Sequence, residues 1–395
     1  PGCSSIGFGA AIELGPLIVV ENGLEYNQQS WYKEANLLFV ESPVGVGFSY
    51  TNTPSDFNNM DDKFVAEDTY IFMVRWLKKF RQFQHCNFFI AGESYAGRHY
   101  VPQLAELVYD RNKMTNKYPH INFKGFIVGN PETSDEFDNQ GILEFAWSHS
   151  IISDQTYYVA KKTCDFRTDD WSDPCADAMI SLWNQYNDID FYNIYAPSCL
   201  ANTTSTFLHH TALTGKNFSY TKACKMQHFL QLLTIPPIQG HSDPCSSQYT
   251  NKYFNRKDVQ KALHVNCRKH GSYIKWQECN YTIFGAYNRS VFSVLPIYKK
   301  LTNAGLKIWM YSGDVDGRVP FIGSRYCVEN LNLTLKTPWT NWYYDHQVAG
   351  RMVEYEGLTF LTVRGAGHSV PSDKPNETLA LIHSYLTGQP LQTHK

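Results

Sequence analysis

The stretch that decides the fold is residues 87–100, NFFIAGESYAGRHY. An apolar run at 88–91 leads into the turn Gly-Glu-Ser-Tyr-Ala-Gly at 92–97, and a helix-forming segment follows at 100–109. In a nucleophile elbow, small residues let a serine occupy a strained turn between strand and helix, where its hydroxyl projects above the sheet. The pattern therefore predicts a strand, a tight turn at Ser94 and a helix, although a capping serine in an ordinary turn fits the same residues.

Strand-like and helix-like segments alternate on both sides of this stretch. Residues 35–40, ANLLFV, predict a strand buried on both faces, and residues 62–80 carry apolar side chains at helical spacing. Further strands are predicted at 123–128, 306–311 and 358–363, and further helices at 10–14, 256–264, 289–303 and 377–386. This order predicts an α/β protein with a mostly parallel central sheet and helices on both faces.

Residues 131–250 interrupt the alternation with short helical segments, aromatic residues and clustered cysteines. We interpret them as a helical cap inserted above the carboxyl edge of the sheet, with an exposed linker at about 201–240. The sheet-forming core is then divided into a first part, 1–130, and a second part, 251–395.

Composition restricts the class of protein. With 395 residues, 43% of them hydrophobic, the chain can bury a large core. A net charge of −2 does not favour nucleic acid or an anionic membrane as a partner, and no window approaches 18 consecutive apolar residues. Ten cysteines without a C-x-x-C pair favour disulfides in an oxidising compartment over a zinc cluster.

Six N-x-[ST] glycosylation sequons also favour an oxidising compartment and predict a secreted or vacuolar glycoprotein. The chain opens with Pro1 rather than an initiator methionine, which predicts a mature piece or a fragment. The six N-x-[ST] sequons are at Asn202, Asn217, Asn280, Asn288, Asn332 and Asn376.

Three predicted strands end in loops that carry the groups of a serine catalytic triad. Ser94 comes first, a pair of aspartates at Asp314 and Asp316 follows, and His368 is last. The order Ser, Asp, His is that of the α/β-hydrolase triad. A serine hydroxyl needs a neutral imidazole to take its proton, and a carboxylate must hold that imidazole in the correct tautomer. Composition does not rank the two aspartates.

Five sequence blocks together resemble the serine carboxypeptidase family of plants, yeast and animal lysosomes. The sequence around them is most similar to plant serine carboxypeptidase-like proteins. The blocks are PGCSS at 1–5, ESPVGVGFSY at 41–50, GESYAG at 92–97, YSGDVD at 311–316 and GAGHSVP at 365–371. The resemblance implies an α/β-hydrolase fold whose first strands lie upstream of residue 1. It also implies Asp316 as the triad acid, with Asp314 structural.

The resemblance assigns the substrate-binding groups as well. Glu93, paired with Glu13, is expected to bind the terminal carboxylate of a peptide, and the amide of Tyr95 is expected to stabilise the oxyanion. Two carboxyl groups forced together share a proton, and only a protonated Glu93 can donate to a carboxylate. Activity is therefore expected in acid. The family's second oxyanion donor is expected upstream of residue 1.

Two positions depart from the family pattern. Arg98 and His99 separate GESYAG from the following tyrosine, where the family usually has one residue. An extra helical residue rotates the rest of the helix by about 100 degrees. Ser369 follows His368 where some plant members carry a glutamate that favours basic terminal residues, so that preference is not expected here.

The resemblance also implies three disulfides, Cys3–Cys279, Cys164–Cys175 and Cys199–Cys245. A buried free thiol is expected at Cys86. No partner is assigned to Cys86, Cys224, Cys267 or Cys327.

These observations predict a serine-type carboxypeptidase that removes residues from peptide C-termini through an acyl-enzyme, without a metal or cofactor. A homodimer is compatible with the sequence. The same scaffold also suits an acyltransferase that uses glucose esters, or a hydroxynitrile lyase. A non-catalytic glycoprotein that binds peptides is the alternative from another class.

Overall fold

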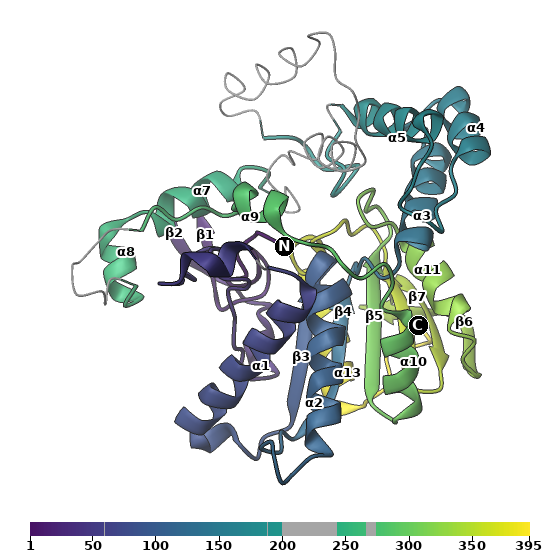
Figure 1. Cartoon of the computed structure of the whole chain (residues 1–395). Helices are drawn as coiled ribbons and strands as arrows, with labels where there is room; N and C mark the ends of the chain where they lie inside the picture. Colours follow the sequence, from purple (N-terminus) through teal and green to yellow (C-terminus); the bar gives the residue numbers. More distant parts are fainter. Residues whose placement is uncertain (59, 188, 200–242, 266–273) are drawn as a thin grey trace.

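A six-stranded sheet forms the centre of the molecule (Figure 1). The computed structural model describes residues 1–395 except 59, 188, 200–242 and 266–273. The strand order is β3-β4-β5-β8-β7-β6; the first four strands are parallel and the last two pair antiparallel. The strands are β3 (Phe88–Glu93), β4 (Phe123–Gly129), β5 (Lys307–Gly313), β6 (Leu335–Tyr344), β7 (Gln347–Tyr355) and β8 (Leu358–Val363). The predicted α/β class is confirmed.

Helices cover both faces of this sheet. Among them, α2 (Val101–Asn112), α10 (Leu295–Asn303) and α13 (Pro375–Thr387) overlap the helices predicted at 100–109, 289–303 and 377–386. The described α-helices other than α3, α4 and α5 are α1 (Asp62–Lys79), α2 (Val101–Asn112), α7 (Ser246–Phe254), α8 (Lys257–Ala262), α9 (Tyr281–Ala286), α10 (Leu295–Asn303), α11 (Phe321–Asn330), α12 (Val370–Asp373) and α13 (Pro375–Thr387). Short 3-10 or π helices are η1 (Ile6–Glu13), η2 (Trp31–Lys33), η3 (Pro54–Asn58), η4 (Arg81–Phe83) and η5 (Ala96–Tyr100).

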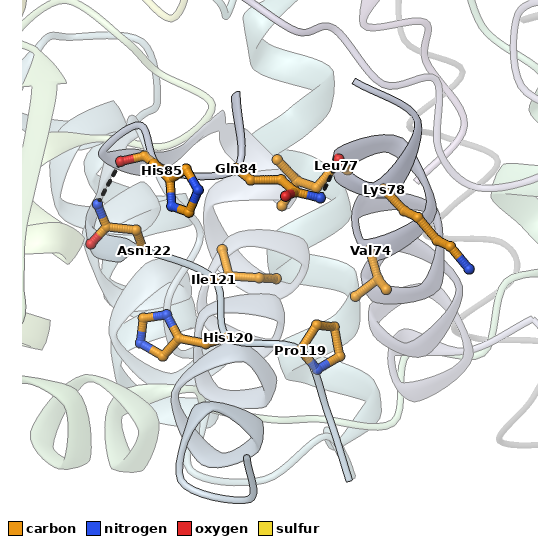
Figure 2. Close-up of a pocket in the computed structure, with 9 residues that line it drawn as sticks. All are labelled: Val74, Leu77, Lys78, Gln84, His85, Pro119, His120, Ile121 and Asn122. Atoms are coloured by element: carbon orange, nitrogen blue, oxygen red, sulfur yellow. Dashed lines mark hydrogen bonds between the residues drawn. The ribbon is translucent and has the colours of Figure 1, made fainter. Parts of the chain in front are cut away.

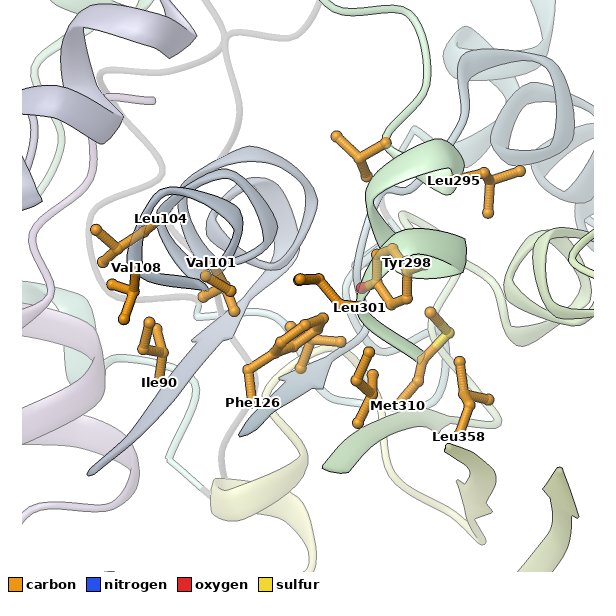
Figure 3. Close-up of a cluster of buried hydrophobic side chains, with 14 of the residues drawn as sticks. Ile90, Val101, Leu104, Val108, Phe126, Leu295, Tyr298, Leu301, Met310 and Leu358 are labelled. Carbon is orange, nitrogen blue, oxygen red and sulfur yellow. The ribbon is translucent and has the colours of Figure 1, made fainter. Parts of the chain in front are cut away.

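The core divides into two layers because successive strand residues point to opposite faces. In β4, Phe126 and Val128 join the cluster under α1, α2 and α10, whereas Ile127 joins the cluster under α13. Figure 3 shows the first cluster, in which Val101 and Leu104 of α2 pack near the sheet. All six residues of β8 are buried, as expected for a strand with both faces covered.

Three helices form a separate layer at one end of the sheet (Figure 1). These cap helices are α3 (Asp135–Ser148), α4 (Asp154–Thr163) and α5 (Asp173–Tyr186), and they share a core of their own that includes Met179 and Leu182. The cap meets the sheet-forming core where Gly141 of α3 and Gly323 of α11 let the two helices approach closely. The predicted linker at 201–240 lies outside the described residues, and the domain boundaries stay predictions.

Residues 35–40 are not a strand, contrary to prediction, and Leu38 in this segment is 40% exposed. An apolar run forms a strand only where a neighbour pairs with its backbone. Among the described strands, the edge strand β3 pairs with β4 alone. Residues 35–40 therefore have no described strand beside them to complete the pairing.

Two further elements differ from the predictions. The helix predicted at 289–303 begins only at Leu295, because Pro296 suits the first turn and the carbonyl of Phe292 already accepts the Asp135 N–H at 3.1 Å. An antiparallel hairpin of β1 (Leu17–Val20) and β2 (Gly23–Tyr26) was not predicted at all. Likewise β6 and β7 add an antiparallel edge to the sheet that the sequence pattern did not indicate.

Three disulfides join the pairs that the resemblance implied: Cys3–Cys279, Cys164–Cys175 and Cys199–Cys245. The expectation for Cys86 was wrong, because this thiol is exposed on the loop that leads from the surface into β3. Cys327 of α11 is the buried free thiol, and Cys224 and Cys267 lie outside the described residues.

The sequons differ in their surroundings. Asn288, Asn332 and Asn376 are exposed, whereas Asn202 and Asn217 lie outside the described residues. Asn280 is partly buried and its side chain caps α9. None of the described helices is both long and apolar enough to cross a lipid bilayer.

Candidate active site

Ser94 occupies the strained turn that the sequence predicted. It follows the last residue of β3 and has a φ of 58°, in the left-handed region that residues other than glycine rarely adopt. A side chain at Gly92 would meet Val101 at 2.6 Å, and one at Gly97 would meet Pro131 at 2.9 Å. The small residues therefore allow the strand and the following helix to pack tightly around the serine.

His368 and Asp316 form a buried pair in loops after β8 and β5. The Nδ1–H of His368 donates to Oδ2 of Asp316 at 2.6 Å, and both side chains are fully buried. Since a carboxylate can only accept, Nδ1 carries the proton and Nε2 is left as the basic nitrogen. Nε2 is buried and has no hydrogen-bond partner among the described residues, so it is free to take a proton from a hydroxyl.

Asp316 is held by three further donors. Its Oδ1 accepts the backbone N–H groups of Arg318 at 2.7 Å and Val319 at 3.0 Å, and its Oδ2 accepts Nδ2 of Asn130 at 2.7 Å. Asp314 instead accepts the N–H of Gly365 at 2.6 Å and so ties the two loops together. Of the two aspartates that the sequence could not rank, Asp316 is the one in contact with the imidazole.

Glu13 and Glu93 lie side by side in the same region. Their carboxyl groups share a hydrogen bond, and Oγ of Ser369, the neighbour of His368, donates to Oε1 of Glu13 at 3.0 Å. Burial raises the pKa of both glutamates, and for Glu93 the charge of Glu13 raises it further. The pair therefore favours retaining a proton, and a protonated carboxyl can donate to an anionic ligand.

Topology brings these groups to one edge of the sheet. Strands β3, β4, β5 and β8 are parallel neighbours, so their carboxyl ends open in the same direction. Glu93 precedes Ser94, Ser369 follows His368, and the two are linked through Glu13. The structure thus links the His368 loop to the Glu13–Glu93 pair, and Ser94 adjoins this pair in the chain, but among the described residues no hydrogen bond joins Ser94 to Nε2 of His368.

A buried aspartate anchors the residue after the serine. The hydroxyl of Tyr95 donates to Oδ1 of Asp62 at 2.7 Å, and the hydroxyl of Tyr287 donates to the same oxygen at 3.0 Å. Asp62 is fully buried in the first turn of α1. This contact restrains the backbone at Tyr95, whose amide is the expected oxyanion donor.

The extra residue of the GESYAGRHY segment is taken up by a π turn. Residues Ala96–Tyr100 form the π-helix η5, and a π turn accommodates one residue more than an α turn. α2 then still buries Val101, Leu104 and Val108 against the sheet. The helix rotation expected from the extra residue is therefore taken up within η5.

The cap contributes contacts that sequence reasoning missed. The N–H of His368 donates to the carbonyl of Tyr192 at 2.7 Å, and the two rings lie 5.0 Å apart. The N–H of Ile194 donates to the carbonyl of Val315 at 3.2 Å, and the N–H of Gly317 donates to the carbonyl of Phe191 at 2.9 Å. Residues 191–194 therefore join the aspartate loop to the histidine loop. Asn130 was also missed, although its place directly after β4 is a signal for this edge.

A cavity of about 530 Å³ lies elsewhere (Figure 2). Its residues precede β3 and β4 or come from the end of α1, so it is at the amino edge of the sheet, opposite the site. It is lined by Val74, Leu77, Lys78, Gln84, His85, Pro119, His120, Ile121 and Asn122.

Comparisons with known proteins identify the family of this chain. The family model described as serine carboxypeptidase matches residues 1–388. The chain is 55% identical over 399 residues to serine carboxypeptidase-like 26 of Oryza sativa subsp. japonica, covering 100% of this chain and 80% of the relative. It is 55% identical over 394 residues to serine carboxypeptidase-like 33 of Arabidopsis thaliana, covering 99% of this chain and 80% of the relative.

The fold is similar to that of Kex1(Δ)p, a prohormone-processing carboxypeptidase from Saccharomyces cerevisiae. The TM-score is 0.75 at 21% sequence identity, over 98% of this chain and 80% of that chain. This likeness supports the α/β-hydrolase fold. From the family match and these relatives together, the chain belongs to the serine carboxypeptidase family.

Proposed function

We propose that this protein removes one residue at a time from peptide C-termini through an acyl-enzyme, with its highest activity in acid. The observation that carries the proposal is the 2.6 Å contact between His368 and Asp316, beside a buried glutamate pair whose pKa values are raised by burial. The His368–Asp316 pair is the general-base part of a serine hydrolase site. The glutamate pair suits a substrate that ends in a carboxylate.

Acylation begins when Oγ of Ser94 attacks the carbonyl carbon of the last peptide bond. The hydroxyl proton moves to Nε2 of His368, and Asp316 stabilises the imidazolium that forms. The Tyr95 amide donates to the oxyanion. As the tetrahedral intermediate collapses, the C–N bond breaks and the imidazolium gives its proton to the leaving amine. Water then repeats the sequence on the ester and frees the shortened peptide.

Glu93 and Glu13 account for the choice of the last bond. A protonated Glu93 donates to the substrate's terminal carboxylate, which sets the distance from that carboxylate to Ser94. A substrate amidated at its C-terminus lacks the negative charge and should bind poorly. This pairing separates a carboxypeptidase from an endopeptidase with the same triad.

The experiment is an activity assay on the full-length protein at acidic pH. An N-blocked dipeptide, its C-terminal amide and a glucose ester with an alcohol acceptor are compared, and Ser94→Ala is the control. Release of the free amino acid from the dipeptide alone supports the proposal. Faster acyl transfer from the glucose ester would instead identify an acyltransferase.

We also propose that the protein matures in the secretory pathway. Three disulfides and exposed sequons at Asn288, Asn332 and Asn376 support this placement. Intact mass before and after N-glycosidase treatment of the native protein is the test. An unchanged mass would count against it.

A further inference from the structure

We propose that Glu132 is a positioning residue for the reaction. Together with Arg98 and Arg318 it forms a buried ion-pair chain that holds the helix after Ser94 at a fixed separation from the loop that carries Asp316. The inference rests on the proposed function, because it assigns Ser94 and Asp316 their catalytic roles.

Glu132 bridges the two arginines from the loop after β4. Its Oε1 lies 2.6 Å from Nη2 of Arg318, and its Oε2 lies 3.4 Å from Nη1 of Arg98. The side chains of Glu132, Arg98 and Arg318 are only 8%, 5% and 13% exposed. Water therefore screens these charges weakly, and each pair is sensitive to a small displacement of its partner.

The Arg98 end of the ion-pair chain lies in the helical segment that follows Ser94. Arg98 stands four residues after Ser94, inside the π turn η5. Its Nη1 also contacts Oδ1 of Asp135 at 2.6 Å, and its Nη2 donates to the carbonyls of Val291 at 3.1 Å and Phe292 at 3.3 Å. These contacts give the guanidinium one orientation and tie η5 to the start of the cap.

The Arg318 end of the ion-pair chain contacts Asp316, the proposed acid of the triad. Its backbone N–H donates to Oδ1 of Asp316 at 2.7 Å while its guanidinium is bound by Glu132. Asn130, two residues before Glu132, donates to the other oxygen of Asp316 at 2.7 Å. The loop after β4 therefore holds Asp316 twice, once directly and once through Arg318.

The charge of Glu132 persists in acid. Burial alone would raise its pKa, but the surrounding positive charges, first Arg318, then Arg98 and Arg289, hold the pKa well below the usual range. Glu132 thus stays ionised under the acidic conditions in which the Glu13–Glu93 pair is protonated. The ion-pair chain and the proton-sharing pair can operate at the same pH.

Glu132→Gln tests the proposal because glutamine keeps the shape and loses the charge. Measurements on the full-length protein are kcat and KM for a blocked dipeptide and the second-order rate of Ser94 labelling by a fluorophosphonate. We expect kcat and the labelling rate to fall about 10- to 100-fold with KM within about twofold. Arg318→Lys, which keeps the charge, should restore part of both rates relative to Arg318→Met.

The matched control is Asp165→Asn, which removes an exposed ion pair with Arg167 at 2.8 Å. It should change neither rate. A folded Glu132→Gln protein that is labelled at the wild-type rate overturns the inference, whereas absence of labelling of wild-type Ser94 overturns the proposed function instead. If Glu132→Gln does not fold, Arg98→Met and Arg318→Met decide, because they remove the charge from the other side of each pair: slower labelling at an unchanged Tm supports positioning, and an unchanged rate refutes it.

Discussion

At the residue scale, the Glu13–Glu93 pair links the expected activity to pH. Both pKa values are raised, so both groups favour the protonated form in the folded protein. Stability from these groups is therefore present in acid and is lost as the pH rises through the raised pKa values. Substrate binding should follow the same direction, because an ionised Glu93 repels a terminal carboxylate.

Glu93→Gln should remove this dependence on pH. An amide donates at every pH, so we expect kcat/KM of the variant to stay level where that of the wild type falls about tenfold per pH unit. The variant should also lose less stability than the wild type between acid and neutral pH. Measurements are the kcat/KM profile and denaturant unfolding at several pH values. Exposed Glu356→Gln is the control, and an unaltered profile for Glu93→Gln would refute the assignment.

The two aspartates after β5 should behave very differently. Asp316→Asn cannot hold the required tautomer of His368 and is expected to lower kcat by about 10⁴-fold, the scale known for such a change in serine proteases. Asp314→Asn keeps an acceptor for Gly365 and should leave kcat within about threefold. Steady-state kinetics with the blocked dipeptide decides. Equal losses in the two variants would contradict the geometry of the site.

At the element scale, a close helix crossing joins the cap to the sheet-forming core. Gly141 of α3 and Gly323 of α11 meet backbone to backbone, and α11 follows the loop that holds Asp316. Any separation of the two helices therefore moves the cap relative to Asp316. Residues 191–194, which link the aspartate and histidine loops, belong to the same layer.

Gly141→Ala should therefore destabilise the protein. The added Cβ would clash with the backbone nitrogen of Gly323, and overpacking of this kind costs about 1–3 kcal/mol. Gly285→Ala in α9 is the matched control, since its Cβ would have nothing within 4 Å and alanine favours a helix. Urea unfolding gives both values. If the two substitutions have the same effect, the crossing is not close in solution.

At the scale of the whole molecule, the Cys3–Cys279 disulfide connects the two parts of the core across 276 residues. The segment that it fastens continues into η1, which carries Glu13. The bond therefore restricts the unfolded chain and also restrains one member of the proposed carboxylate-binding pair.

Cys3→Ser/Cys279→Ser should lower the free energy of unfolding by roughly 3–5 kcal/mol, because the loop released is long. The same variant should raise KM for the blocked dipeptide more than it lowers kcat. Cys86→Ser is the control, because this exposed thiol is free and should be neutral. The comparison uses guanidinium unfolding and steady-state kinetics. A double variant as stable as Cys86→Ser would remove the structural role assigned to this bond.

Local patterns in the sequence determined the α/β class, the elbow at Ser94 and the strands whose loops carry Asp316 and His368. These features depend on short-range properties: apolar runs, small residues in a turn, and helical spacing. The choice of Asp316 over Asp314 came from the resemblance, and the Cys3–Cys279 pairing did too, since neither follows from local pattern.

Tertiary structure alone decided what depends on neighbours distant in the chain. Residues 35–40 are apolar enough for a strand but have no described strand to pair with. In the sequence alone, Glu132 is an ordinary glutamate in a loop. Folding places it between Arg98, which is 34 residues away, and Arg318, which is 186 residues away. The physical reason is that pairing, burial and charge compensation arise only when separate segments meet, and a local pattern does not encode those meetings.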